Sequence, residues 1–112
     1  SFDQEFTLSV LGVFGQNLWK LCTSRPSIAA VCRDLDINRV QFNRYMSGLS
    51  FPKPNVLEKI CNYFQVDARI ILEELTDEQM ELVHNGKNAR SAETEGSYLH
   101  NAVEYFERGI SL

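Results

Sequence analysis

A short segment near the middle of the chain carries four long polar side chains that can recognise nucleic-acid bases. Within residues 38–47 these are Arg39, Gln41, Asn43 and Arg44. Arginine forms two hydrogen bonds with guanine, and asparagine or glutamine does so with adenine. These residue types on one short helix are therefore typical of a helix that reads the major groove of DNA. They would equally suit a solvated helix face, and composition alone leaves both interpretations open.

This segment is the second of two predicted helices that are joined by a tight turn. Ser27 is a suitable N-cap for the first helix, residues 27–36, and Asn38 is one for the second, residues 38–47. Asp36 stands at the turn, because aspartate is one of the few non-glycine residues that tolerate a left-handed backbone. The apolar residues at helical spacing are Ile28, Val31, Cys32, Leu35, Val40, Phe42, Tyr45 and Met46. The two helices form a helix-turn-helix pattern.

The first residues, 1–13, are an ambiguous lead-in that fits either an apolar strand or the start of a helix. Gly12 and Gly15 weaken a continuous helix there. From Phe14 onward, apolar residues at helical spacing predict a helix that ends after Cys22.

Helical patterns continue after the helix-turn-helix. Apolar spacing predicts a fourth helix over residues 56–64 and a fifth, short one over residues 67–75. Thr76 and Gln79 have the form of a capping box, which predicts that a further short helix begins there. We expect residues 14–75 to form one domain.

The remaining residues, 76–112, are expected to form a helical extension. Residues 84–97 are polar and glycine-containing, which indicates a loop or linker, and residues 98–110 carry an amphipathic helical stripe. That stripe could pack on the domain, mediate a dimer, or lead into an effector domain beyond this chain. Because the chain begins with serine, we expect it to be a fragment of a longer protein.

Charge is distributed unevenly along the 112 residues. The net charge is −4, yet residues 20–59 hold seven basic and three acidic residues. A basic middle between acidic ends fits contact with a polyanion or a set of solvated helix faces, and charge alone leaves both interpretations open. No run approaches the roughly 20 apolar residues that a membrane span requires, and no signal peptide is visible, so we expect a cytoplasmic protein without a membrane partner.

Nothing in the sequence predicts an enzyme. The three cysteines lack a CxxC pair and are expected to be buried thiols in a reducing cytosol. His84 and His100 stand alone, without ligands at metal-binding spacing, and are expected on the surface. No nucleophile set and no glycine-rich phosphate loop is present. We therefore expect no catalytic residues, metal or cofactor.

Residues 14–75 resemble the lambda-repressor-like, or xenobiotic-response-element-type, helix-turn-helix family. The resemblance is carried by "LWKLC", by "SIAAVCRDLDINRVQFNRYMSG", and by "PKPNVLEKICNYFQVDARIILEEL" with its proline-bearing loop and final short helix. It implies an all-α fold, namely a five-helix lambda-repressor-like domain, here with a C-terminal helical extension. It also implies a prokaryotic-type transcriptional regulator that binds double-stranded DNA as a homodimer.

By the same resemblance, residues 27–36 are the positioning helix and residues 38–47 the recognition helix. The base-reading positions are then Arg39, Val40, Gln41, Asn43 and Arg44. The positions expected to contact phosphate are Ser27, Asn38 and Lys53.

A second interpretation is a protein-interaction module, such as an antitoxin or adaptor built on the same fold, with weak or no DNA binding. Two departures from the family pattern favour it. Ile28 stands where many relatives have a phosphate-binding glutamine, and Asp36 where most have glycine. The acidic C-terminal third points the same way.

Overall fold

The computed structural model describes residues 2–90, with side chains described from residue 12 onward. In this range the chain is all-helical, with five α-helices, one 3-10 helix and no β-strand. The elements are α1 (Phe2–Cys22), α2 (Ile28–Leu35), α3 (Arg39–Met46), α4 (Pro54–Phe64), the 3-10 helix η1 (Ala68–Ile71) and α5 (Asp77–His84). The all-α prediction is thus confirmed for these residues. The predicted helix over residues 98–110, and the linker beyond Arg90, lie outside the described residues.

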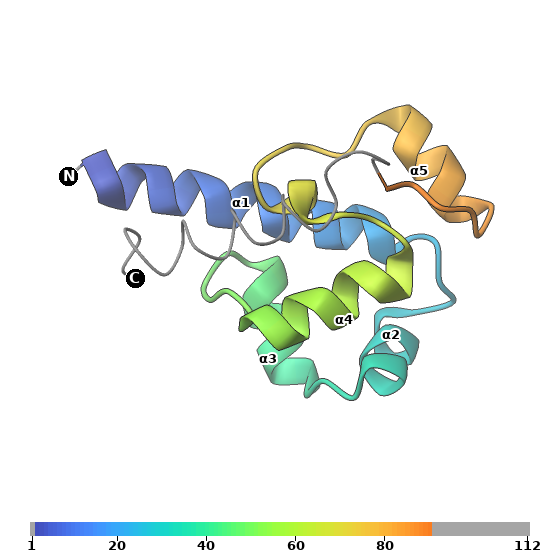
Figure 1. Cartoon of the computed structure of the whole chain (residues 1–112). Helices are drawn as coiled ribbons and strands as arrows, with labels where there is room; N and C mark the ends of the chain where they lie inside the picture. The colour runs from blue at the N-terminus through green and yellow to red at the C-terminus, as the bar shows by residue number, and fades with distance from the viewer. Residues whose placement is uncertain (1, 91–112) are drawn as a thin grey trace.

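The long helix α1 is the element against which most of the others pack. It contacts α3, η1 and α5, while α2 contacts α3 and α4. In Figure 1, α1 runs across the upper part of the molecule, α4 lies in front, and α2 and α3 form the lower edge. Residues 2–13 are helical, so the lead-in is the start of α1 and not a strand. The helix continues through the boundary that we expected between residues 13 and 14.

Gly15 is needed where α1 meets α3. A Cβ atom built on Gly15 would overlap the carbonyl oxygen of Met46 and lie 3.1 Å from that of Tyr45. The two main chains are therefore in direct contact at this point. The glycine that weakens the helix locally allows the close approach of α3, and this packing offsets its low helix propensity.

The hydrophobic core lies between α1, α3, α4 and η1. Its largest fully buried side chains are Phe14, Phe42, Phe64, Leu18, Leu21, Leu57, Ile60, Ile70, Ile71, Val31 and Val66. All three cysteines are buried and free, as the sequence predicted. The stripe of Phe14, Leu18 and Leu21 follows the expected helical spacing and faces this core.

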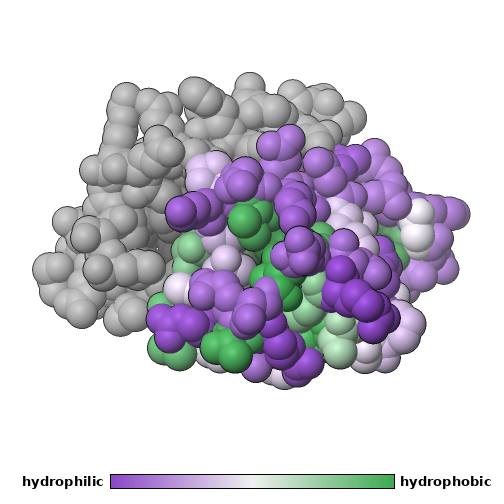
Figure 2. All heavy atoms as spheres, turned by 90° about the horizontal axis from the view of Figure 1, so that it is seen from below, coloured by the Kyte–Doolittle hydropathy of each residue, from purple (hydrophilic) through white to green (hydrophobic). Residues whose placement is uncertain are grey.

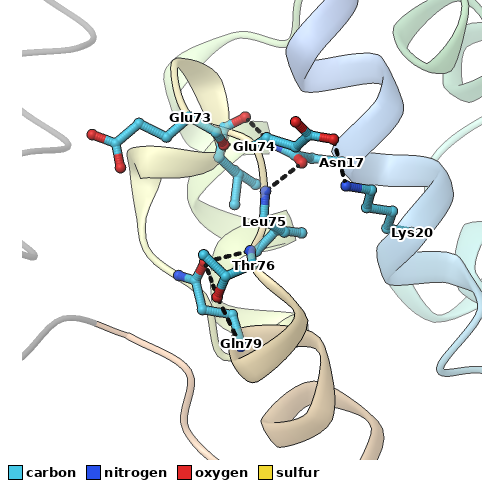
Figure 3. A network of polar contacts seen from close by, with 8 residues as sticks. Asn17, Lys20, Glu73, Glu74, Leu75, Thr76 and Gln79 are labelled. Atoms are coloured by element: carbon cyan, nitrogen blue, oxygen red, sulfur yellow. Dashed lines mark hydrogen bonds and ion pairs between the residues drawn. The ribbon is translucent and has the colours of Figure 1, made fainter.

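A fully buried polar residue, Asn17, joins α1 to the segment after η1 (Figure 3). Its Nδ2 donates to the carbonyl oxygens of Ile70 (2.7 Å) and Glu73 (2.8 Å), and its Oδ1 accepts from the backbone N–H of Leu75 (2.9 Å). The side chain amide thus satisfies three backbone groups that lack a helical partner. The salt bridge between Lys20 and Glu74, 2.9 Å long, lies beside it at the surface.

The segment after α4 is shorter as a helix than predicted. A helix was expected over residues 67–75, but only the four residues of η1 are helical, and Leu72 is exposed. The carbonyls of Ile70 and Glu73 bond to Asn17 instead of continuing a helix. The capping box that begins α5 is confirmed: Gln79 N–H donates to Thr76 Oγ1, and Thr76 N–H donates to Gln79 Oε1 (Figure 3).

Candidate nucleic-acid interface

The connection between α2 and α3 is built from local signals that the sequence contains. Ser27 caps α2, since its Oγ accepts from Ala30 N–H at 3.0 Å. Asp36 ends α2 with a left-handed backbone at φ 54°, and the N–H of Ile37 returns to the carbonyl of Cys32. The N–H of Asp36 also donates to the carbonyl of Arg33, so this is a Schellman motif with aspartate in the place of glycine. Three residues, 36–38, separate the two helices.

α3 begins at a capping residue, as predicted. The Oδ1 of Asn38 accepts from Val40 N–H at 2.8 Å and from Gln41 N–H at 3.4 Å. This oxygen is therefore committed to the helix end. Because Asn38 is exposed, its position at the start of α3 still faces solvent.

One face of α3 is anchored in the core and the opposite face is open. Phe42, Tyr45 and Met46 are buried. The exposed residues are Arg39, Val40, Asn43 and Arg44, while Gln41 is half-buried. The predicted base-reading positions therefore share the outer side of one helix. Seen from below, this face of the molecule is mixed: hydrophilic atoms surround a run of hydrophobic surface near its middle (Figure 2).

Val40 departs from the pattern of buried positions that the sequence suggested for α3. Its side chain is 69% exposed, so it does not anchor the helix. The 3.6-residue period explains this: Val40 lies about half a turn away from Phe42 and about a third of a turn away from Met46 around the helix axis. It is an apolar side chain on the otherwise polar outer face.

Two of the polar side chains on α3 already have partners. Arg39 Nε donates to Asn43 Oδ1 at 3.0 Å, one turn further along the helix. Gln41 Nε2 donates to Ser50 Oγ at 3.1 Å in the loop that follows α3. The first contact pre-orients Arg39 and Asn43 relative to one another, and the second turns Gln41 toward the loop.

The three residues expected at phosphates lie at helix starts and are exposed. Ser27 and Asn38 are the N-caps of α2 and α3. Lys53 precedes α4, whose first position is Pro54 and whose N-terminus has no side-chain cap. A helix N-terminus with a free cation beside it is favourable for an anion.

The acidic residues near α2 differ in their surroundings. Asp34 accepts a 2.6 Å hydrogen bond from the Tyr63 hydroxyl, which ties α2 to α4. Burial, followed by this bond to Asp34, raises the pKa of Tyr63. Asp36 is exposed at the turn, next to the start of α3.

The buried thiols are not suited to nucleophilic chemistry. Burial raises the pKa of Cys22 to about 11, and Cys32 adds to the rise, whereas the nearby guanidinium groups of Arg39 and Arg25 lower it. Burial likewise raises the pKa of Cys32. Both thiols are therefore protonated at neutral pH, and the thiolate is the reactive form.

Two other kinds of site are absent from the part of the chain that the structure describes. Among residues 2–90, no group of three histidine, cysteine or carboxylate side chains is placed to hold a metal ion. No helix in the same range has the length and apolar character to cross a bilayer. His84 is exposed at the end of α5, with its Nε2 3.2 Å from Thr23 Oγ1, as expected for a surface histidine.

One exposed aromatic residue was not singled out by the sequence patterns. Trp19 on α1 is 54% exposed. In the sequence, Trp19 lies outside the apolar stripe of Phe14, Leu18 and Leu21. This position predicts that its side chain is exposed, but it predicts no function. His100 lies outside the described residues.

Comparisons with known proteins identify no relative. No protein-family model, no curated protein and no solved structure matches this chain.

Proposed function

We propose that this chain is a sequence-specific, double-stranded-DNA-binding transcriptional regulator of the lambda-repressor-like kind, which reads the major groove with α3. The observation that carries the proposal is the division of α3 into two faces. Phe42, Tyr45 and Met46 fix the helix to the core, and Arg39, Asn43 and Arg44 project from its outer side. A capped, anchored helix with a row of exposed base-recognition side chains suits insertion into the major groove.

Each exposed side chain on α3 has a defined role in this proposal. Arg39 and Arg44 supply bidentate donors for guanine, and Asn43 pairs with adenine. The exposed methyl groups of Val40 suit contact with the methyl group of thymine. Gln41, held by Ser50, contributes from the edge of the helix. Each good base contact is worth about 1–3 kcal/mol of discrimination.

Phosphate contacts set the affinity and the register. Ser27, Asn38 and Lys53 are exposed at the starts of three different helices, which supports a contact to the DNA backbone on either side of α3. Replacing Lys53 with alanine should weaken all sequences alike and reduce the slope of log affinity against log salt by about 1. Replacing Arg44 with alanine should instead relax the base preference at one position.

We further propose that the protein acts as a cytoplasmic homodimer. Proteins that use this motif bind two half-sites about one helical turn apart, and a single domain offers little contact area. Residues 98–110, outside the described part, are one candidate contributor to the dimer. A sensory or effector domain beyond this chain would supply any response to a ligand.

The test of the function is selection of bound duplexes from a random pool. We expect an inverted-repeat sequence to be enriched by the wild-type chain and lost with Arg39→Ala/Arg44→Ala. The matched control is Lys59→Ala/Lys87→Ala, which removes the same charge from exposed positions outside α2 and α3 and should keep the enrichment. No enrichment by the wild-type chain would refute sequence-specific reading.

The alternative is a protein-interaction module on the same fold. It is favoured by two exposed apolar residues, Val40 on α3 and Leu49 just after it, and by the exposed carboxylate of Asp36. Salt separates the two functions, because DNA binding weakens steeply with salt through counterion release. A partner protein held by Val40 and Leu49 would show a shallow dependence.

A further inference from the structure

A hydrogen bond on the outer face of α3 fixes the orientation of one side-chain amide. Arg39 Nε donates to Asn43 Oδ1 at 3.0 Å, one helical turn further along, and both residues are exposed. The arginine side chain carries donors and no acceptor, so this contact forms only when the oxygen of the Asn43 amide faces Arg39. The bond therefore determines which way round the oxygen and the nitrogen of this amide point.

The second amide on this helix is held by a partner of a different kind. Gln41 Nε2 donates to Ser50 Oγ at 3.1 Å. Because a serine hydroxyl can also donate, either end of the Gln41 amide can face it. The last torsion of an amide side chain is broad and roughly two-fold, so an amide without a donor-only neighbour can exchange its two ends. Asn43 is thus held in one of its two orientations, and Gln41 is not.

The bond between Arg39 and Asn43 does not use the atoms that base contacts require. Nη1 and Nη2 of Arg39 can still donate to O6 and N7 of guanine. Asn43 Oδ1 has a second lone pair for the N6 amino group of adenine, and Nδ2 can donate to N7. Within residues 12–90, neither side chain has another hydrogen-bond or salt-bridge partner. Residues four apart on a helix have Cβ atoms roughly 5–6 Å apart, and successive nucleotides of a strand are roughly 3.4 Å apart, so the two side chains can reach neighbouring base pairs.

We propose that Arg39 and Asn43 read neighbouring base pairs as one unit, in which Arg39 contacts guanine and also holds the Asn43 amide in the orientation that reads adenine. The inference rests on the DNA-binding role proposed above. In the opposite orientation, the NH2 group of Asn43 would face the N6 amino group of adenine, and two donors would oppose one another. Arg39 thus reads one base and is the positioning residue for the next, so the base preferences at the two positions are coupled.

The coupling is measured with single variants in the selection from a random duplex pool. The position that Asn43 reads is the one whose adenine preference is lost in Asn43→Ala. Discrimination there is the ratio of dissociation constants for the selected duplex and for a duplex changed at that position alone, measured by fluorescence anisotropy at one salt concentration. We expect Arg39→Ala to abolish the guanine preference at its own position and to lower the adenine discrimination at the Asn43 position about fivefold.

Two further variants test whether the bond, and not the charge, is responsible. Arg44→Ala removes the same charge from an exposed position of the same helix but leaves the bond, so it should keep the adenine discrimination. Arg39→Lys keeps a side chain that only donates, and it should restore most of that discrimination. An exposed pair of residues four apart contributes little to helix stability, so all variants should unfold thermally close to the wild-type temperature.

Three outcomes would overturn the coupled reading. Unchanged adenine discrimination in Arg39→Ala, or an equal loss in Arg44→Ala, would do so while leaving sequence-specific DNA binding intact. A selected sequence without adenine at the position that Asn43→Ala relaxes would also refute it. No enrichment of any duplex by the wild-type chain would refute the proposed function together with this inference.

Discussion

Replacing Asn17 with alanine should destabilise the fold more than any other single polar substitution at residues 12–22, the part of α1 whose side chains the structure describes. The substitution removes all three hydrogen bonds that hold residues 70–75 against α1. The bonds to Ile70 O and Leu75 N are buried, so water cannot replace them, and each loss costs about 1–2 kcal/mol. The bond to Glu73 O is partly buried and adds about 0.5–1 kcal/mol.

The expected loss is therefore about 2.5–5 kcal/mol in the free energy of unfolding, a large share of the roughly 5–15 kcal/mol of a typical domain. Urea unfolding followed by far-ultraviolet circular dichroism measures it, provided the slope with denaturant is unchanged. Gln16→Ala, at the exposed neighbouring position, is the matched control and should change stability by less than about 0.5 kcal/mol.

Asn17→Asp sharpens the test, because it keeps the shape and removes the donors. An ionised carboxylate would face the carbonyl oxygens of Ile70 and Glu73, so the folded state raises the pKa of this carboxyl above its unfolded value of about 3.9. The Asn17→Asp variant therefore loses stability relative to the wild type as the pH rises through that folded pKa. It regains this stability when the pH falls below about 4, the pKa of the unfolded state. A cost below about 1 kcal/mol for Asn17→Ala, or no pH dependence for Asn17→Asp, would refute the reasoning.

Three further outcomes follow from local contacts. Gly15→Ala should destabilise by about 1–3 kcal/mol, because the added Cβ overlaps the carbonyl of Met46, whereas Gly12→Ala, with open space around it, should stabilise by about 0.5–1 kcal/mol; thermal unfolding of both variants compares the signs. Asn38→Ala should cost about 1 kcal/mol by removing the cap of α3, and restored stability in Asn38→Ser would show that capping is responsible. The pKa of Cys22 is about 11 in the folded chain against 9.0 ordinarily, so the thiol stabilises the fold below pH 9.0 and this contribution is lost as the pH rises toward 11. Cys22→Ala should flatten that alkaline part of the stability curve, and an unchanged curve would contradict the burial of the thiol.

The elements that could be predicted from the sequence are those whose signals are local. The caps Ser27 and Asn38, the turn at Asp36 and the box of Thr76 and Gln79 each depend on atoms within a few residues, and all are confirmed. The residue types on the outer face of α3 could also be predicted, because a 3.6-residue period separates them from Phe42 and Met46.

The features that the sequence could not predict depend on distant partners. The bonds of Asn17 reach residues 53 to 58 positions away, and they divert the carbonyls that a longer helix after α4 would have used. From its neighbours in sequence, Gly15 is predicted to weaken the helix. Its stabilising effect comes from the close contact with α3, which the local sequence does not show. The pairing of Arg39 with Asn43, and of Gln41 with Ser50, depends on rotamers that no pattern of residue types specifies.

The contact of Gly15 with the end of α3 also bears on how this surface can diversify. Main chain meets main chain there, and the side chains that anchor α3 in the core, Phe42, Tyr45 and Met46, all lie on its inner face. Arg39, Asn43 and Arg44 can then be exchanged as a set, each at a cost to folding of about 0.5 kcal/mol or less. The backbone of α3 would keep its position while its exposed side chains vary. The outer face of α3 is therefore a suitable target for randomised libraries.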